Sequence, residues 1–509
     1  MFEKAKILKE RYGKNLKTPF LQELLWFHRI KEDQDKELLT LEFLNVCASH
    51  AREGKLFDKE MTTAVYRKDI QVRNILYNFP GLESIVKSSD EENVKWQKIE
   101  DELERNLEKP FKYGYLKNRF ESVDVFYTSV SLLRKASLGM ATSRRWTSKF
   151  LFPFSFETLF IDVDNRNETF SMDRRFFSRG GEVLYMMISR AKNIDVLKSL
   201  METIFDNPTQ NKRWNDLLAT LRDDKNIYSD NTQLGFLGAE SHEVFDQLVD
   251  DLIALLQSNI THNDFFEHFS SISAFYMAHF ILTVALQTKK TSLLTNGEEK
   301  VVYPVELLAS KSDHVRRSSR QTYKINEDLP FEALESVFDS YIETLRDITD
   351  KEVLLQKLDD DLNYRDDEDS YIEGFDFLVI QKKIWSLIYT KAKGDLLSIH
   401  RILLKGAGLA SAKKTNSYRY LASDDWLKTL VLINVQSRMP FHNFVDQLYD
   451  KYGFIISNKH SSLLLETYSE NDYKKNESRL FERLRALGLL ESKSDGYAYV
   501  INRYGRNKV

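Results

Sequence analysis

The chain has 509 residues, of which 42% are hydrophobic and 29% are charged, and its formal net charge is -4. This composition excludes a fibrous or globally disordered protein, and the length allows roughly two to four domains that each bury a core. Because the net charge is slightly negative, any contact with nucleic acid must come from local basic patches. Only 18 glycines and 8 prolines are present, which favours long helices over a β-sandwich or barrel.

Cysteine content and hydropathy indicate which covalent links, metal sites and cellular compartments are compatible with this chain. Cys47 is the only cysteine, which excludes an internal disulfide and any zinc site needing two thiolates from this chain. We interpret it as a small buried side chain. The longest apolar run, residues 272–286, is shorter than a membrane span and is interrupted by His279. The basic N-terminus lacks the apolar segment of a signal peptide, so we expect a cytoplasmic protein without membrane contact.

The sequence pattern predicts three mainly helical segments before residue 423. Residues 1–125 show amphipathic spacing throughout and predict a helical bundle. Residues 126–357 form a central helical domain with two short strands, within 150–165 and 299–309, that could pair in a small sheet. The helix over 263–287 is apolar almost all round and should lie at the centre of the core. Residues 358–422 form a helical connector with an acidic hinge at 359–370 and a linker at 405–420.

Residues 423–509 carry the most specific pattern. Ser423 is a good N-cap, Pro440 suits the first turn of a second helix, and Gly453 ends that helix. A further helix from about 472 to 487 precedes two short strands joined through 494–496, where Asp-Gly favours a tight turn. Helices followed by such a hairpin are typical of a winged helix. We therefore predict a mainly α, multi-domain helical protein with a small β element in its middle and a C-terminal winged helix.

The end of this module is basic. From residue 474 to 509 nine Lys and Arg residues face four acidic residues. Cations on a groove-facing helix and wing can neutralise DNA phosphates. The predicted DNA-binding residues there are Lys475, Ser478, Arg479, Arg483, Arg485 and Lys493. The alternative is a winged helix that contacts only protein, because Glu482 and Glu491 dilute the basic face.

Two further basic clusters lie in the middle of the chain. In the first cluster, arginines lie on both sides of a predicted strand. The last of them precedes Gly180 and Gly181, which begin a predicted helix whose free N-H groups could bind a phosphate. Its candidate DNA contacts are Arg144, Arg145, Arg174, Arg175 and Arg179, and those of the second cluster are Arg316, Arg317 and Arg320. Convergence of both clusters with the winged helix would form an extended DNA track. Otherwise these side chains form solvated surface or salt bridges.

Catalytic signals are poor. Asp162 and Asp164 could bind a divalent cation, although paired aspartates after a strand are more often turn residues. A phosphate-binding glycine loop ending in Lys-Ser or Lys-Thr is absent, as is a nucleophile elbow. We predict no catalytic residue, no metal ligand and no cofactor.

Three stretches also carry a family resemblance: RRFFSRGGEVLYMMISRA, YPVELLASKSDHVRRSSRQTY, and RMPFHNFVDQLYDKYGFIIS together with RLRALGLLESKSDGYAYVINRY. Here the chain resembles uncharacterised accessory subunits of bacterial anti-phage defence operons. The resemblance implies partner subunits, such as a motor ATPase or a DNA-modifying enzyme, that supply the chemistry. The sequence thus predicts a non-enzymatic DNA-binding adaptor or scaffold of a bacterial complex. The alternatives are a metal-dependent nuclease and a condensin-like structural accessory protein.

Overall fold

The computed structural model shows a mainly helical chain with a few small sheets. Its elements fall into two compact units, and each is described by itself: unit 1 comprises Met1–Lys36, Arg190–Lys192 and Phe236–Val509, and unit 2 comprises Glu37–Ser189 and Asn193–Gly235. The structure describes residues 5–12, 19–26, 28, 34–77, 79, 81–105, 111–136, 155–160, 163–164, 171–172, 179–206, 208–223, 225, 227–235, 239–307, 313–364, 376–412, 417–465, 469–493 and 497–505.

Unit 2 is built around one long antiparallel strand pair and a buried helix. Strand β1 (Thr63–Asp69) pairs with β4 (Ile227–Gln233) in the register Thr63↔Gln233, and helix α3 (Lys36–Arg52) is buried along most of its length. Cys47 lies buried in α3, as the sequence predicts. The other elements of this unit are α4 (Ile70–Tyr77), α5 (Leu82–Val86), α6 (Glu92–Arg105), α7 (Tyr115–Arg119), α8 (Val123–Ala136), η3 (Phe156–Thr158), β2 (Val163–Asp164), β3 (Ser171–Met172), α9 (Gly180–Ile188), α10 (Ile194–Phe205) and α11 (Pro208–Leu221).

The centre of unit 1 is helix α13 (His262–Lys289). It packs against α12 (Glu243–Leu256), α14 (Asp313–Glu343) and α18 (Asp424–Asn434). The prediction of a core helix is confirmed, because its side chains from Phe269 to Leu286 are buried. By length and composition α13 could cross a membrane, but its most apolar window is entirely buried inside the protein, as in a core helix.

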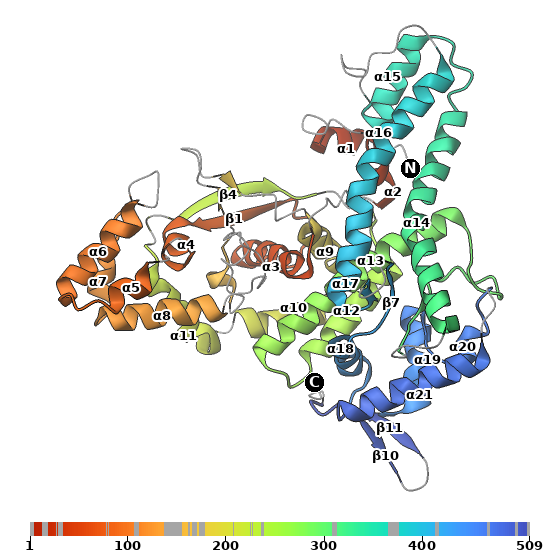
Figure 1. Ribbon diagram of the computed structural model, residues 1–509. Coiled ribbons are helices and arrows are strands. Elements are labelled where there is room, and N and C mark those ends of the chain that lie inside the picture. Colours follow the sequence, from red (N-terminus) through yellow and green to blue (C-terminus); the bar gives the residue numbers. More distant parts are fainter. Residues whose placement is uncertain are drawn as a thin grey trace. The chain divides into compact units, whose positions relative to one another are not determined.

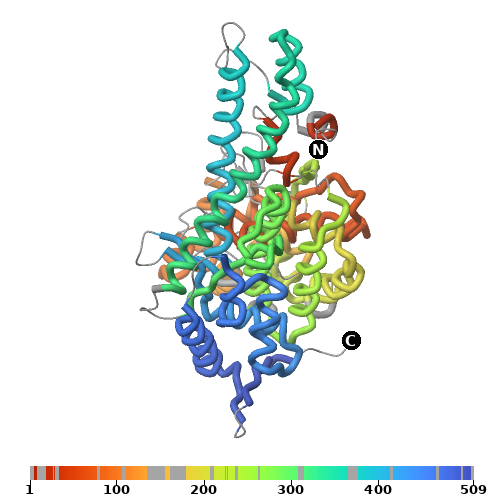
Figure 2. Tube along the Cα trace, turned by 90° about the vertical axis from the view of Figure 1, so that its right-hand side faces the viewer, coloured from red at the N-terminus to blue at the C-terminus, as the bar shows by residue number. Residues whose placement is uncertain are grey.

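Long helices of unit 1 form a projecting arm. Helix α14 runs beside α16 (Phe377–Ser398), and α15 (Lys351–Leu362) lies at their far end in both views (Figures 1 and 2). Two short N-terminal helices join this part of the unit: α1 (Ala5–Tyr12) packs on α15, and α2 (Leu21–Trp26) packs on α13 and α14. Residues 365–370 of the predicted acidic hinge lie outside the described residues.

The stretch expected to be a linker, 405–420, is folded where it is described. Helix α16 continues through a π-helical turn, η5 (Ile399–Leu403), into α17 (Leu404–Ala407). Strands β6 (Ala410–Ser411) and β7 (Arg419–Tyr420) then pair antiparallel. Tyr420 is fully buried, so this segment is part of the core of unit 1. The predicted segment boundaries at 125, 357 and 422 stay predictions.

The C-terminal helices begin and end where local signals place them. The Ser423 side chain caps α18 by accepting from the Trp426 N-H, and Gly453 (φ 74°) ends α19 (Phe441–Tyr452). The predicted hairpin is present as β10 (Leu490–Ser492) and β11 (Ala498–Ile501). Strand β8 (Arg438–Pro440) adds to β11, which gives a three-stranded sheet in the order β10-β11-β8. The remaining elements of this region are β9 (Phe454–Ile455), α20 (Asn458–Ser461) and α21 (Glu470–Ala486).

The predicted pairing of the two central strands is wrong. Strand β2 pairs with β3, whereas β5 (Tyr303–Pro304) pairs in parallel with β9, about 150 residues further along. Gly453 permits this approach, since a Cβ there would lie 2.0 Å from the Val301 carbonyl oxygen. The strand at 303–304 therefore ties the middle of unit 1 to its C-terminal helices.

Candidate functional site

Helix α21 divides into a buried and an exposed face. Ser469 caps its start by accepting from the Asp472 N-H, and Tyr473, Leu480 and Leu484 bury one side at helical spacing. The opposite side, including Lys475, Ser478 and Arg485, is exposed. The sequence prediction of which α21 residues face solvent therefore agrees with the structure for these three.

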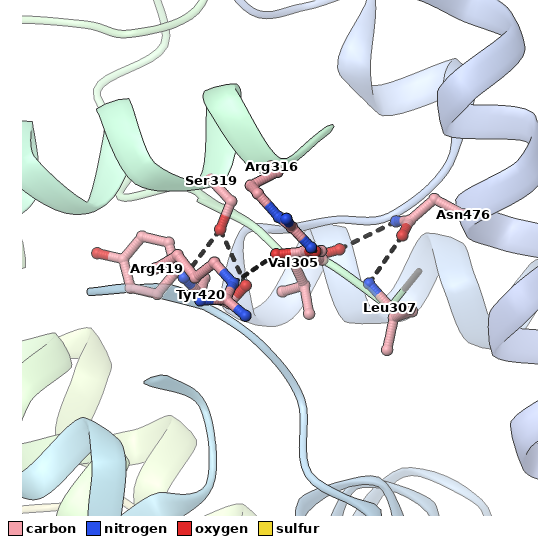
Figure 3. A network of polar contacts seen from close by, with 8 residues as sticks. Val305, Leu307, Arg316, Ser319, Arg419, Tyr420 and Asn476 are labelled. Atoms are coloured by element: carbon pink, nitrogen blue, oxygen red, sulfur yellow. Dashed lines mark hydrogen bonds and ion pairs between the residues drawn. The ribbon is translucent and has the colours of Figure 1, made fainter. Parts of the chain in front are cut away.

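Asn476, on the buried face, fixes the position of α21. Its Oδ1 accepts from the Leu307 N-H at 2.8 Å, and its Nδ2 donates to the Val305 carbonyl at 2.9 Å and to the Ile456 carbonyl at 3.1 Å (Figure 3). The side chain has no solvent exposure. Three of the four hydrogen bonds that an amide side chain can form thus hold α21 against residues 303–307 and Ile456.

The two remaining arginines predicted on α21 are engaged by other residues of the chain. Arg479 pairs with Glu482 at 2.8 Å and keeps 40% of its side chain exposed. Arg483 donates to Asp424 and to the Ala422 carbonyl, and only 18% of its side chain is exposed. Arg483 therefore joins α21 to the start of α18, whereas Arg479 can still reach a partner in solvent.

Two cations, Lys493 after β10 and Arg438 on β8, lie beside an aromatic ring of β11. Lys493 Nζ lies 5.4 Å from the Tyr499 ring centroid, and the Arg438 guanidinium lies 4.6 Å from the same centroid. Cations over an aromatic face are attracted by its quadrupole, which limits their motion without neutralising them. Helix α21 packs against β10, so these cations belong to the same module as the exposed α21 side chains. Residues 494–496 of the turn lie outside the described residues.

The first central cluster is described only at Arg179, because Arg144, Arg145, Arg174 and Arg175 lie outside the described residues. Arg179 has φ 69° and precedes helix α9. The Gly181 N-H, a donor that the sequence offers to a phosphate, is taken by Glu42 Oε2 at 2.7 Å. Burial raises the pKa of Glu42, the nearby Glu182 raises it further, and the charge of Arg179 opposes both.

The second central cluster does converge, but on a pocket rather than an open track. Arg316, Arg317 and Arg320 of α14 line a cavity of about 650 Å³ in unit 1. The other residues of its wall are Gln321, Tyr323, Lys324, Glu327, Arg401, Ser417 and Tyr418. The sequence analysis did not identify Tyr323, Arg401 and Tyr418 as site residues. They come from α14, η5 and the segment before β7, respectively, which only the fold brings together. The run SYRY at 417–420 was the one available signal, since it places aromatic residues beside a basic side chain.

The network of Figure 3 also supports one wall of this pocket. Glu306 Oε1 accepts from Arg316 Nε at 3.0 Å and from Nη2 at 2.8 Å, while Glu306 Oε2 accepts from Arg419 Nε at 2.6 Å. Ser319 accepts from the Tyr420 N-H and donates to the Tyr420 carbonyl, which ties α14 to β7 (Figure 3). The pocket wall and α21 are therefore both anchored to the segment 303–307.

No family model, curated protein or solved structure matches the chain. The site must therefore be interpreted from its own residues. Among the described residues, no group of three or more His, Cys, Asp or Glu side chains is arranged to hold a metal ion. Asp162 lies outside the described residues, and Asp164 stands in β2 opposite Ser171. His268 and His279 are hydrogen-bonded to Thr429 Oγ1 at 2.7 Å and to the Tyr303 hydroxyl at 2.8 Å, as expected of core histidines.

Proposed function

We propose that the chain is a non-enzymatic DNA-binding adaptor of a multi-protein complex, and that residues 423–505 act as a winged helix whose α21 enters a DNA groove. The order of elements supports this: helix α18, strand β8, helix α19, the short strand β9, the short α20, the long α21 and a hairpin whose second strand pairs with β8. In helix-turn-helix proteins and their relatives, the last helix before the hairpin occupies the recognition position.

The observation that carries the proposal is the set of three cations, Lys475, Arg479 and Arg485, on the outer side of α21 beside the hairpin, where acidic residues such as Glu482 alternate with them. Lys475 and Arg485 are exposed, and Arg479 is partly exposed. Glu482 pairs with Arg479 at the surface, where an ion pair contributes only about 0–1 kcal/mol. A DNA phosphate can therefore replace Glu482 as the partner of Arg479, because an arginine–phosphate contact is charge-assisted and can be bidentate.

A titration of fluorescent duplex DNA at several salt concentrations tests the proposal. The variant combines Lys475→Ala, Arg479→Ala and Arg485→Ala and leaves Arg483 in place, because Arg483 holds α21 to α18. Each lost phosphate contact should reduce the slope of log K against log salt by about 0.9 and weaken binding at low salt. The triple variant should therefore show a slope that is shallower by about 2 to 3.

A charge-matched control separates this effect from a general loss of positive charge. Lys357, Lys382 and Lys393 lie on α15 and α16 of the arm, and their combined change to alanine removes the same charge. The control should bind like the unmodified chain. Equal affinity and slope for both variants, or no DNA binding by the unmodified chain, would contradict the proposal. Plasmid cleavage in Mg²⁺ that disappears in Asp164→Ala would replace the adaptor role with that of a nuclease.

A further inference from the structure

The cavity on α14 gathers positive charge from separate parts of the chain. Arg316, Arg317, Arg320 and Lys324 project from one face of α14, and Arg401 comes from η5. Among the described residues that line the cavity, Glu327 is the single carboxylate. Even when Glu306 and Asp328, which pair with Arg316 and Lys324, are counted, five cations face three carboxylates. The cavity therefore favours an anionic ligand.

Two of these arginines are held in place while part of each guanidinium stays available. Glu306 takes the Nε edge of Arg316, and Glu327 accepts from Arg401 Nε at 2.6 Å. Burial opposes ionisation of Glu327, but the hydrogen bond and charge of Arg401 hold its pKa below the ordinary value. A guanidinium has five N-H donors in a rigid fork, so one carboxylate partner leaves donors for a second anion. Such fixed donors reduce the entropy lost on binding.

Tyr323 supplies an independent sign of a ligand. The residue lines the cavity and is only 2% exposed, yet its hydroxyl has no hydrogen-bond partner among the described residues. Burial raises the pKa of Tyr323, so the phenol stays neutral and can donate. An unsatisfied buried hydroxyl destabilises the folded protein, and a bound acceptor would remove that cost. The Tyr323 ring stacks on Tyr418 at 5.5 Å between centroids, and Arg401 lies over Tyr418 at 5.7 Å.

We propose that this cavity binds a nucleotide, with its phosphate on the arginines of α14 and η5 and with Tyr323 donating a hydrogen bond to it. Arginine forks match phosphate oxygens bidentately, which favours phosphate over a simple carboxylate. The volume of about 650 Å³ exceeds that of one phosphate and lies in the range of pockets for nucleotide-sized ligands. The guanidinium planes of the exposed Arg317 and Arg320 offer stacking surfaces for a base. The nucleotide is either free or the 5′-phosphorylated end of a nucleic-acid strand.

This site is separate from the outer face of α21, so the two proposals can fail independently. Calorimetric titration of the full chain would use four probes: ATP, AMP, a short 5′-phosphorylated single strand and the same strand without the phosphate. Binding of ATP or AMP identifies the free nucleotide as ligand. Tighter binding of the phosphorylated strand than of its unphosphorylated counterpart identifies the strand end. The α21 triple variant should bind the preferred probe as well as the unmodified chain does.

Two variants test the named contacts. Arg317→Ala with Arg320→Ala removes two exposed side chains of the wall, and binding should weaken by about tenfold or more, since charge-assisted hydrogen bonds are lost. Tyr323→Phe keeps the ring stack and removes the hydroxyl, and binding should weaken by about threefold to tenfold. Arg346→Ala, an exposed arginine outside the cavity, is the matched control. Absence of binding by every probe at about 1 mM, equal binding of both strands without nucleotide binding, or unchanged affinity in both wall variants would overturn the proposal.

Discussion

Replacement of Asn476 should detach α21 from the segment that also supports the basic pocket. In Asn476→Ala, the Leu307 N-H and the carbonyls of Val305 and Ile456 lose their partner in a fully buried site. At about 1 kcal/mol for each hydrogen bond, the variant should lose about 3 kcal/mol of unfolding free energy. Ser478→Ala is the matched control, because Ser478 is exposed on the same helix and bonds only to the Lys474 carbonyl.

Asn476→Asp distinguishes the hydrogen-bond argument from a simple loss of volume. An aspartate has the same shape and can accept from the Leu307 N-H, but its second oxygen would face two carbonyl oxygens. Burial and these carbonyls should raise the folded-state pKa of the new carboxyl group above about 3.9. The variant would then lose stability as pH rises from about 3.9 through the raised folded-state pKa, so its free energy of unfolding should be lower at pH 8 than at pH 5.

Hydrogen exchange resolves these effects locally. The Leu307 amide should exchange faster in Asn476→Ala than in the unmodified chain, and urea unfolding gives the overall loss of stability. Ser478→Ala should change stability by no more than about 0.5 kcal/mol. An Asp variant as stable as the unmodified chain at both pH values, with a still-protected Leu307 amide, would show that Asn476 does not hold α21 as described.

Two further changes test the packing. Glu42→Gln keeps an acceptor for the Gly181 N-H and removes the ionisable group. Burial and Glu182 raise the folded-state pKa of Glu42 to about 8, so the unmodified chain should lose up to roughly 1.4 kcal/mol of stability per pH unit as pH rises from 4.5 to about 8, and no more above that. Urea midpoints of the Gln variant should not show this loss. Gly453→Ala should lower the melting temperature strongly, since its Cβ would meet the Val301 carbonyl at 2.0 Å. Gly54→Ala, at a similar φ of 69° with open space around it, should cost only the backbone strain, and an equal effect of the two would refute the close-approach argument.

Local signals predicted the helices of the C-terminal region well. Ser423 and Gly453 act through their own hydrogen bonds and φ values, so their effect can be predicted from a short window of sequence. The apolar spacing that buries Leu480 and Leu484 is likewise a property of one helix. These features depend on residues that are close in sequence.

The candidate site was harder to predict from the sequence, because it is formed by residues far apart in the chain. Arg483 has the same spacing as its basic neighbours, yet it bonds to Asp424, 59 positions away. Arg316 was predicted as a contact to DNA at the surface. Its hydrogen bond to Glu306 and its position beside Arg401 depend instead on how α14 packs. Charge and spacing do not tell which side of a helix will meet another segment.

The sequence by itself determined the helical character of the chain, the buried core helix α13 and the bounds of α18 and α19, since backbone propensity, capping and apolar periodicity act over a few residues. Only the tertiary structure decided that β5 pairs with β9 and that basic and aromatic side chains of α14, η5 and the segment before β7 surround one cavity. Such contacts join segments separated by tens to hundreds of residues. Their free energy comes from burial and hydrogen bonding that exist only once the chain has closed those loops.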